Sequence, residues 1–171
     1  RSSRILDNLA SMGVPGVTGA YAHPGSASGY GLVAVALKQL YPGHAAQVLA
    51  LTAQCPASAY CTKWIIAVDD DIDPTDIDQV MWAMTTRANP SDDIDILRNC
   101  WMSRNDVSLA PEMRPYGSKA LINACTPHKY LASASRRTFL RKSMYQQVAA
   151  RWQALGLPGE APVLDHFHPE G

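Results

Sequence analysis

Apolar residues in the first half of the chain alternate between spacing typical of strands and spacing typical of helices. Residues 17–22 and 32–37 are short apolar runs on either side of a Gly- and Ser-rich loop, which predicts an extended segment and then a buried strand. Apolar positions within residues 45–55 recur at helical spacing, which predicts a helix that ends before Pro56. The β-branched run 64–68 then predicts an interior strand of a parallel or mixed sheet.

Two shorter amphipathic segments frame this region. Residues 1–13 predict a connecting helix with Ser2 and Ser3 as its caps, because their apolar positions fall on one side. Thr75 is the expected cap of a second helix, whose apolar face lies within residues 77–84. Helix therefore follows strand repeatedly along the chain.

The second half of the chain shows weaker periodicity. Residues 94–97 predict a short strand, and residues 101–117 predict a long loop of the kind that often forms the wall of a site. A short helix is expected over residues 118–125, and a long amphipathic helix over residues 136–155. The proline-rich tail, residues 158–171, is expected to wrap a neighbouring surface or to be mobile.

Strands that alternate with helices indicate an α/β domain, with three layers (α/β/α) around a mixed or mostly parallel sheet. We expect residues 1–13 to form the connecting helix and residues 14–130 to form the α/β domain. Residues 131–171 are expected to add the long C-terminal helix and tail, and to supply an oligomer contact.

Composition narrows the class of protein. The 171 residues (18.6 kDa) are 47% hydrophobic, enough for one compact domain, and 15 basic residues balance 15 acidic ones, which disfavours a nucleic-acid partner. No apolar run approaches the roughly 18 residues that cross a bilayer, so no membrane partner is expected. The four cysteines are expected to be free thiols in a reducing cytoplasm. Because the first residue is Arg1 and not Met, we expect a longer parent protein.

Three groups of residues are candidates for chemistry. The acidic run Asp69–Asp73 follows a predicted strand. Its members either cap the next helix and pair with basic side chains at a domain or subunit contact, which we favour, or bind a cation such as Mg²⁺. His166 and His168 are a possible metal pair or an ordinary surface tail, and metal analysis separates these alternatives. Cys61 is either a thiol nucleophile or, as we favour, a small hydrophobic residue. No complete catalytic set is visible by spacing.

Four blocks of sequence occur in the order found in one known family: residues 41–45, 63–74, 78–87 and 117–127. Together they resemble the C-terminal domain of the UbiD-like decarboxylases, over about residues 5–130. The resemblance implies an α/β/α domain within an enzyme that reversibly decarboxylates aromatic or α,β-unsaturated carboxylic acids.

The resemblance also implies the cofactors and partners. Prenylated FMN, Mn²⁺ (or Mg²⁺) and K⁺ are bound in the family by a larger N-terminal portion, which also carries the catalytic Glu-Arg-Glu set, so no catalytic, cofactor-binding or metal residue is assigned here. The expected partners are that N-terminal flavin-binding portion, an aromatic acid substrate and further copies in a homodimer or hexamer. The alternative is a stand-alone, non-catalytic interaction or assembly subunit.

Two loops are implied to form the substrate side of the cleft, one before the strand at residue 64 and one after the strand at residue 94. Trp101 is expected to be a flat apolar wall and Ser103 a hydrogen-bond partner for the acid. The substrate-pocket candidates are Tyr60, Cys61, Thr62, Trp101, Met102 and Ser103.

Overall fold

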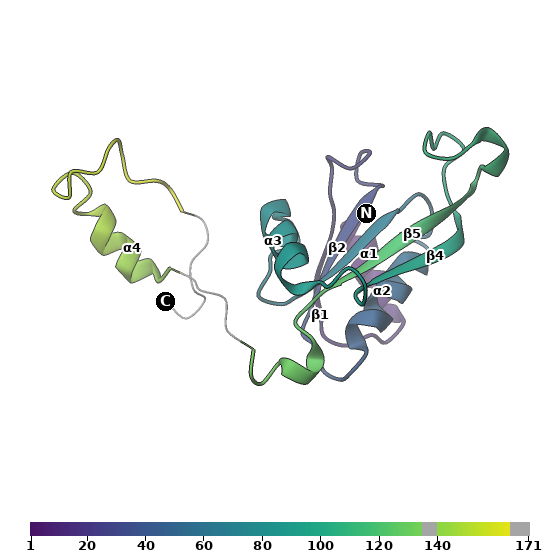
Figure 1. Ribbon diagram of the computed structural model, residues 1–171, viewed down its shortest axis with the longest axis horizontal. Coiled ribbons are helices and arrows are strands. Elements are labelled where there is room, and N and C mark those ends of the chain that lie inside the picture. The colour runs from purple at the N-terminus through teal and green to yellow at the C-terminus, as the bar shows by residue number, and fades with distance from the viewer. Residues whose placement is uncertain (135–139, 165–171) are drawn as a thin grey trace. The chain divides into compact units, whose positions relative to one another are not determined.

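The computed structural model describes residues 1–134 and 140–164. The chain forms two compact units, Arg1–Ser133 and Ala134–Gly171 (Figure 1). Within the described ranges, every helix is too short or too polar to cross a membrane.

A five-stranded mixed sheet forms the centre of the first unit. The strand order is β1-β2-β3-β5-β4, in which β2, β3 and β5 run parallel and the edge strands β1 and β4 run antiparallel to their neighbours. The strands are β1 (Val17–Ala22), β2 (Leu32–Leu37), β3 (Trp64–Asp69), β4 (Ile94–Trp101) and β5 (Tyr116–Ala124). The expected mixed sheet is therefore confirmed.

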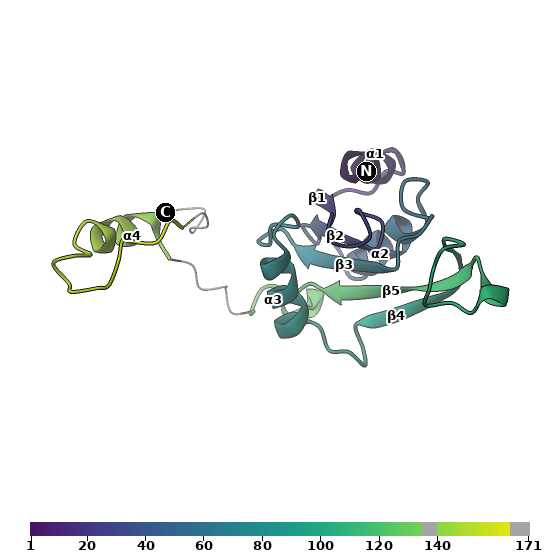
Figure 2. The same cartoon turned by 90° about the horizontal axis from the view of Figure 1, so that it is seen from above.

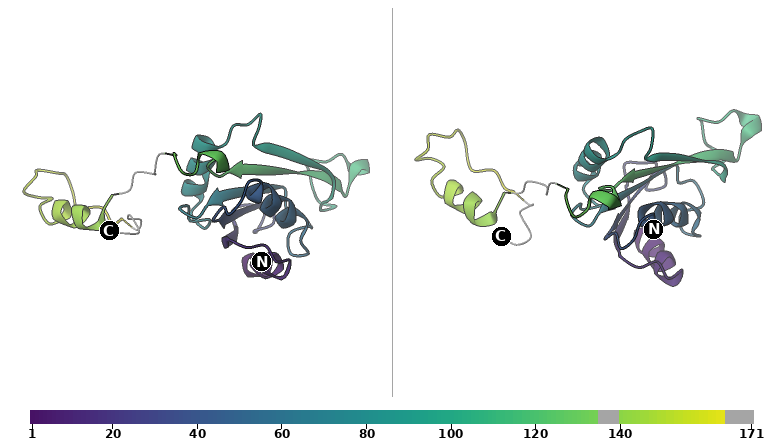
Figure 3. Two further views of the ribbon diagram at one scale, coloured as in Figure 1. Left: turned by 90° about the horizontal axis from the view of Figure 1, so that it is seen from below. Right: turned by 60° about the horizontal axis from the view of Figure 1, so that its bottom comes forward.

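Helices cover both faces of this sheet (Figures 2 and 3). α1 (Ser2–Ser11) and α2 (His44–Gln54) bury Leu9 and Val48 against alternate residues of the central strands, such as Ile65. α3 (Ile77–Arg87) packs Val80 against the opposite face, which includes Ile66. Because successive strand residues point to opposite faces, one apolar run supplies both core layers. The three-layer α/β/α expectation is confirmed.

The predicted short helix over residues 118–125 is wrong, because these residues belong to β5. Ala120 and Leu121 are good helix formers, but β5 is a central strand whose pairing with both β3 and β4 outweighs that local preference. The predicted loop is shorter than expected for the same reason. Trp101 ends β4 and Tyr116 begins β5, so the connection spans residues 102–115 and contains a short 3-10 helix, η1 (Pro111–Met113).

Two helix caps also differ from expectation. Neither Ser2 nor Ser3 caps α1; the hydroxyl of Ser2 instead accepts a hydrogen bond from the Ala22 N–H (3.0 Å) and ties the helix to β1. The cap of α3 is Asp76 and not Thr75, because the Asp76 carboxylate accepts two backbone N–H groups of the first turn. A carboxylate also interacts favourably with the helix dipole, which a hydroxyl does not.

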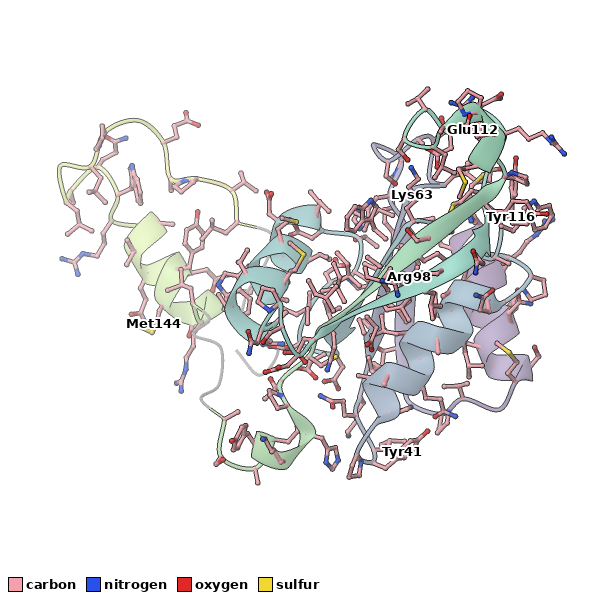
Figure 4. All side chains as sticks on the ribbon, turned by 45° about the vertical axis from the view of Figure 1, so that its right-hand side comes forward. Tyr41, Lys63, Arg98, Glu112, Tyr116 and Met144 are labelled. Carbon is pink, nitrogen blue, oxygen red and sulfur yellow. The ribbon has the colours of Figure 1, made fainter. Side chains whose placement is uncertain are left out.

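The second unit contains a single helix among its described residues, α4 (Lys142–Ala149). The helix expected over residues 136–155 is therefore too long, although residues 136–139 lie outside the described residues. Its apolar side chains at Leu140, Met144 and Val148 are exposed (Figure 4 labels Met144), so packing within the unit does little to extend the helix.

Candidate functional site

A cavity of about 480 Å³ opens where the parallel strands begin, which we call the amino edge of the sheet. Three segments line it: residues 27–31 before β2, residues 60–63 before β3 and residues 102–107 before β5. Its surface is mostly apolar. Because β2, β3 and β5 are neighbours and parallel, the segments that precede them meet at the same edge.

Lys63 and Tyr116 lie at this amino edge, whereas Tyr41, which follows β2, lies at the opposite end (Figure 4). The opposite end, where the parallel strands finish, is the carboxyl edge. The two predicted loops thus come together although about 40 residues of sequence separate them. Sheet order, which the sequence did not specify, brings them into contact.

Four of the six candidate residues line the cavity: Tyr60, Cys61, Met102 and Ser103. Met102 is buried and lies against Gly117, where any Cβ would come within 2.5 Å of the Met102 side chain. A glycine is therefore required at position 117 for this wall of the cavity.

Trp101 lines an adjoining hollow of about 430 Å³ together with Tyr60. The two rings are 4.8 Å apart at an angle of 54°, and 62% of Trp101 is exposed. The Cys61 N–H donates to the Trp101 carbonyl (3.3 Å), which joins the two loops directly. The pair forms an aromatic platform beside the cavity.

Thr62 is the candidate that lines neither the cavity nor the adjoining hollow. It is fully buried, and its hydroxyl oxygen accepts hydrogen bonds from Arg1 (2.6 Å) and Ser58 (3.1 Å). Cys61 lines the cavity, whereas the side chain of Thr62 points away from it into the core. Thr62 supports the loop from behind.

Cys61 has a backbone φ of +68°. This left-handed conformation costs a residue with a side chain about 1 kcal/mol, and it persists where surrounding contacts fix it. The thiol is half-buried and free, whereas the other three cysteines are free but buried. The roles of Cys61 as nucleophile or as apolar wall stay predictions.

Lys63 and Asp106 form an ion pair across the cavity that sequence reasoning missed. The Lys63 Nζ lies 2.7 Å from both the Asp106 carboxylate and the Ser108 hydroxyl. Burial opposes ionisation of Asp106, but its hydrogen bonds to Lys63 and Ser108 prevail and lower its pKa below the usual value. The pair anchors the loop that precedes β5 to the residue that precedes β3.

Arg1 is a second residue that the pattern did not reveal. Its guanidinium donates to the carbonyls of Gly29 (2.8 Å), Ala57 (3.0 Å) and Tyr60 (3.0 Å) and lies 4.4 Å from the centre of the Tyr30 ring. Arg1 therefore connects two of the three segments that line the cavity. A third missed residue, Lys119, donates to the carbonyls of Ser58 and Ala59, just before the segment 60–63.

Two members of the acidic run, Asp69 and Asp71, pair with a basic side chain at the carboxyl edge, as we favoured, but within the domain and not at a domain or subunit contact. The capping role expected of the run is wrong, because Asp76, outside the run, caps α3. Asp69 accepts hydrogen bonds from the Gln39 amide (2.7 Å), the Thr126 N–H (2.7 Å) and Arg87 (3.0 Å). Arg87 also forms a bidentate pair with Asp71 (2.9 and 2.7 Å). Burial alone would lower the pKa of Arg87, but the two carboxylates raise it.

No group of three His, Cys, Asp or Glu side chains in residues 1–134 and 140–164 is placed to hold a metal ion. His166 and His168 lie outside the described residues. The donor set on these residues therefore does not fit the Mn²⁺ or Mg²⁺ that the resemblance assigns to the N-terminal portion.

Comparison with known proteins places this arrangement in a family. Residues 1–124 match the family model for the 3-octaprenyl-4-hydroxybenzoate carboxy-lyase C-terminal domain. The chain is 36% identical over 97 residues to a phenolic acid decarboxylase of Sedimentibacter hydroxybenzoicus, covering 56% of this chain and 19% of that protein. It is 32% identical over 125 residues to a phenolic acid decarboxylase of a Streptomyces species (strain D7), covering 72% of this chain and 25% of that protein. The chain thus spans a quarter or less of the length of these curated relatives.

Solved structures show the same fold. Vanillic acid decarboxylase of S. hydroxybenzoicus in its closed form matches with a TM-score of 0.72 at 27% identity, covering 90% of this chain and 31% of that one. The apo 3,4-dihydroxybenzoic acid decarboxylase of Enterobacter cloacae shares the fold with a TM-score of 0.71 at 23% identity, covering 82% of this chain and 30% of that one. On the match over residues 1–124, this chain belongs to the family of UbiD carboxy-lyase C-terminal domains.

Proposed function

We propose that this chain is the C-terminal substrate-capping and oligomerisation domain of a UbiD-class decarboxylase. The enzyme removes CO₂ non-oxidatively and reversibly from an aromatic or α,β-unsaturated carboxylic acid. Prenylated FMN, with Mn²⁺ (or Mg²⁺) and K⁺, is held by the N-terminal flavin-binding portion of the same enzyme. Residues 131–171 supply the contact between copies.

The cavity at the amino edge carries this proposal. Its walls combine aromatic and apolar side chains, including Tyr60 and Met102, with a few polar groups such as Ser103. Ligand sites for flat organic acids have this composition, because apolar walls bind the ring and polar groups fix its orientation. The Tyr60–Trp101 platform adds a flat face beside the opening.

The residues of this chain act on the position and solvation of the acid. Prenylated FMN, when bound by the N-terminal portion, supplies the electron sink for the loss of CO₂. Trp101 and Tyr60 restrict the plane of the ring, and Ser103 donates or accepts a hydrogen bond at its edge. Met102 and the loop fixed by Lys63 exclude water, which strengthens polar interactions inside the closed cleft.

The mass and the activity of the natural protein test this function. We expect the denatured protein from its source to weigh much more than the 18.6 kDa of this chain, to absorb as a flavoprotein after loading with prenylated FMN, and to release CO₂ from an aromatic acid. A mass near 18.6 kDa, with no decarboxylation in the presence of a flavin-binding partner, would establish the stand-alone assembly subunit instead.

A further inference from the structure

Lys119 is buried beneath the cavity, with only 1% of the residue exposed. It lies on the central strand β5, and its side chain points to the face that α2 covers. Its Nζ donates to three backbone carbonyls: Ala53 (3.0 Å), Ser58 (3.1 Å) and Ala59 (2.7 Å). A buried ammonium is costly unless its N–H groups are paired, and here each has one acceptor.

The three carbonyls belong to the turn that leads from α2 into the cavity. Ala53 lies in the last turn of α2, whose carbonyls lack helical partners and carry the negative end of the helix dipole. Ser58 and Ala59 immediately precede Tyr60 and Cys61 in the chain. A single cation therefore fixes both ends of the segment that delivers these two side chains.

The segment needs such support because its conformation is strained. Cys61 has a positive φ, which an unsupported chain would relax. Beyond Lys119, the segment is held by Arg1 at Tyr60 and by the Trp101 carbonyl at Cys61. These contacts act from the side, whereas Lys119 acts from the core, where neither water nor salt competes.

We propose that Lys119 is a positioning residue, whose three hydrogen bonds to the turn after α2 hold Tyr60 and Cys61 in the wall of the substrate cavity. The position of the turn does not depend on the proposed decarboxylase activity; only the effect on substrate binding rests on it.

The proposal predicts a response to alkaline pH. The groups that face Lys119 are Cys55 on the turn itself, Cys61 at its end, Cys100 on β4 and Arg1 at the side. Burial lowers the pKa of Lys119 to about 8, with a further decrease from Arg1 and opposing increases from the cysteines. A neutral amine has two N–H groups for three carbonyls, so deprotonation releases one of them and loosens the turn.

Local hydrogen exchange in the full-length protein at neutral pH tests the positioning role. In Lys119→Met, which removes all three hydrogen bonds to the turn, we expect the amides of residues 58–62 to exchange at least about tenfold faster. Lys119→Arg retains the cation and should recover most of the protection. Lys38→Met, at an exposed lysine, is the control and should change nothing there. Unchanged exchange at residues 58–62 in a folded Lys119→Met protein would overturn the proposal.

A measurement on the unaltered protein covers the case in which Lys119→Met does not fold. The ¹³C-methyl resonance of Ala59 should shift with an apparent pKa near the value of about 8 for Lys119. A resonance that does not move between pH 7 and 9.5, on either side of that pKa, would overturn the proposal.

Kinetics separate this inference from the proposed function. In the loaded enzyme, Lys119→Met should raise KM for the acid about tenfold more than it lowers kcat, with flavin content unchanged. Faster local exchange in Lys119→Met, together with an unaltered protein that does not decarboxylate, would leave the positioning role intact and reject the proposed enzyme activity. Unaltered KM together with unaltered exchange would reject the positioning role and retain the enzyme.

Discussion

The two edges of the sheet use charged residues in opposite ways. At the carboxyl edge, Asp69 accepts three hydrogen bonds and Arg87 is shared between two carboxylates, so these groups have their partners within the chain. At the amino edge, loops enclose a cavity of about 480 Å³ beside two exposed aromatic rings. Open α/β sheets usually bind ligands at the carboxyl edge, and this domain leaves the other edge open.

The charged groups that are most conspicuous in the sequence are thus already paired within the chain, so the number of polar groups does not by itself indicate a binding site. The acidic run is the most conspicuous cluster in the sequence, yet its members brace β3 against α3 and the segment after β5. The cavity has fewer charges, and its one ion pair, Lys63–Asp106, fixes a loop. Mutations at the two edges should therefore separate stability from substrate binding.

The largest effect should come from the carboxyl edge. Asp69→Ala leaves the half-buried Arg87 with one carboxylate and removes the acceptor of Gln39 and the Thr126 N–H, so we expect a loss of about 3 kcal/mol in the free energy of unfolding. Urea unfolding of the full-length protein measures it. Asp70→Ala, at the exposed neighbour, is the control and should cost less than about 0.5 kcal/mol. Equal losses in the two variants would contradict the structural role of Asp69.

The aromatic platform should show the opposite behaviour. Trp101→Ala in the complete enzyme removes an exposed ring, so the stability should change little, whereas KM should rise about tenfold or the range of accepted acids should change. Flavin content should stay the same. Trp64→Ala is the matched control, since Trp64 is 51% exposed but lines neither the cavity nor the hollow beside Trp101. Indistinguishable kinetics on a panel of aromatic acids would remove Trp101 from the pocket.

The Lys63–Asp106 ion pair at the amino edge acts as a clamp on the loop before β5, and its loss should have a smaller effect. Asp106→Asn keeps the shape of the side chain and removes its charge, which weakens the contact to Lys63 and should cost about 0.5–1 kcal/mol. In Asp106→Asn, the hydrogen-exchange rates of the amides of residues 102–109 should rise, while the amides of the core strands keep their protection. Asp95→Asn, at an exposed carboxylate of β4, is the control. A uniform rise across the domain would contradict a local clamp.

Acid should release the same clamp. The pKa of Asp106 is lowered in the folded chain, so its contribution to stability is complete above the ordinary aspartate pKa of about 4 and is lost as the pH falls through the lower folded value. Unfolding free energies of the natural protein and of Asp106→Asn should therefore converge below about pH 4. A constant difference down to pH 2.5, well below that ordinary value, would show that Asp106 is not ionised in the pair.

The parts of the fold that the sequence predicted have clear periodicity. β2, β3, α2 and α3 follow from apolar runs and helical spacing. β5 was missed because a central strand, buried on both faces, lacks the alternation that distinguishes strands from helices. The end of α4 was missed because an apolar stripe extends a helix only where it is packed, and that of α4 is exposed.

The site was predictable in part, for a different reason. Family resemblance named two loops, and the structure places four of the six named side chains on one cavity. Lys119, Lys63 and Arg1 support these side chains through contacts between residues that are 28 to 66 positions apart in the chain. Only the order of the strands in the sheet brings these residues together. No local pattern encodes such contacts.

The change in hydrogen exchange when an aromatic acid binds to the complete, flavin-loaded enzyme tests the central claim most directly. We predict protection of residues 59–63 and 101–107, at the amino edge, and no change in residues 69–76 at the carboxyl edge. Protection confined to residues 69–76, with the amino-edge loops unaffected, would contradict the account.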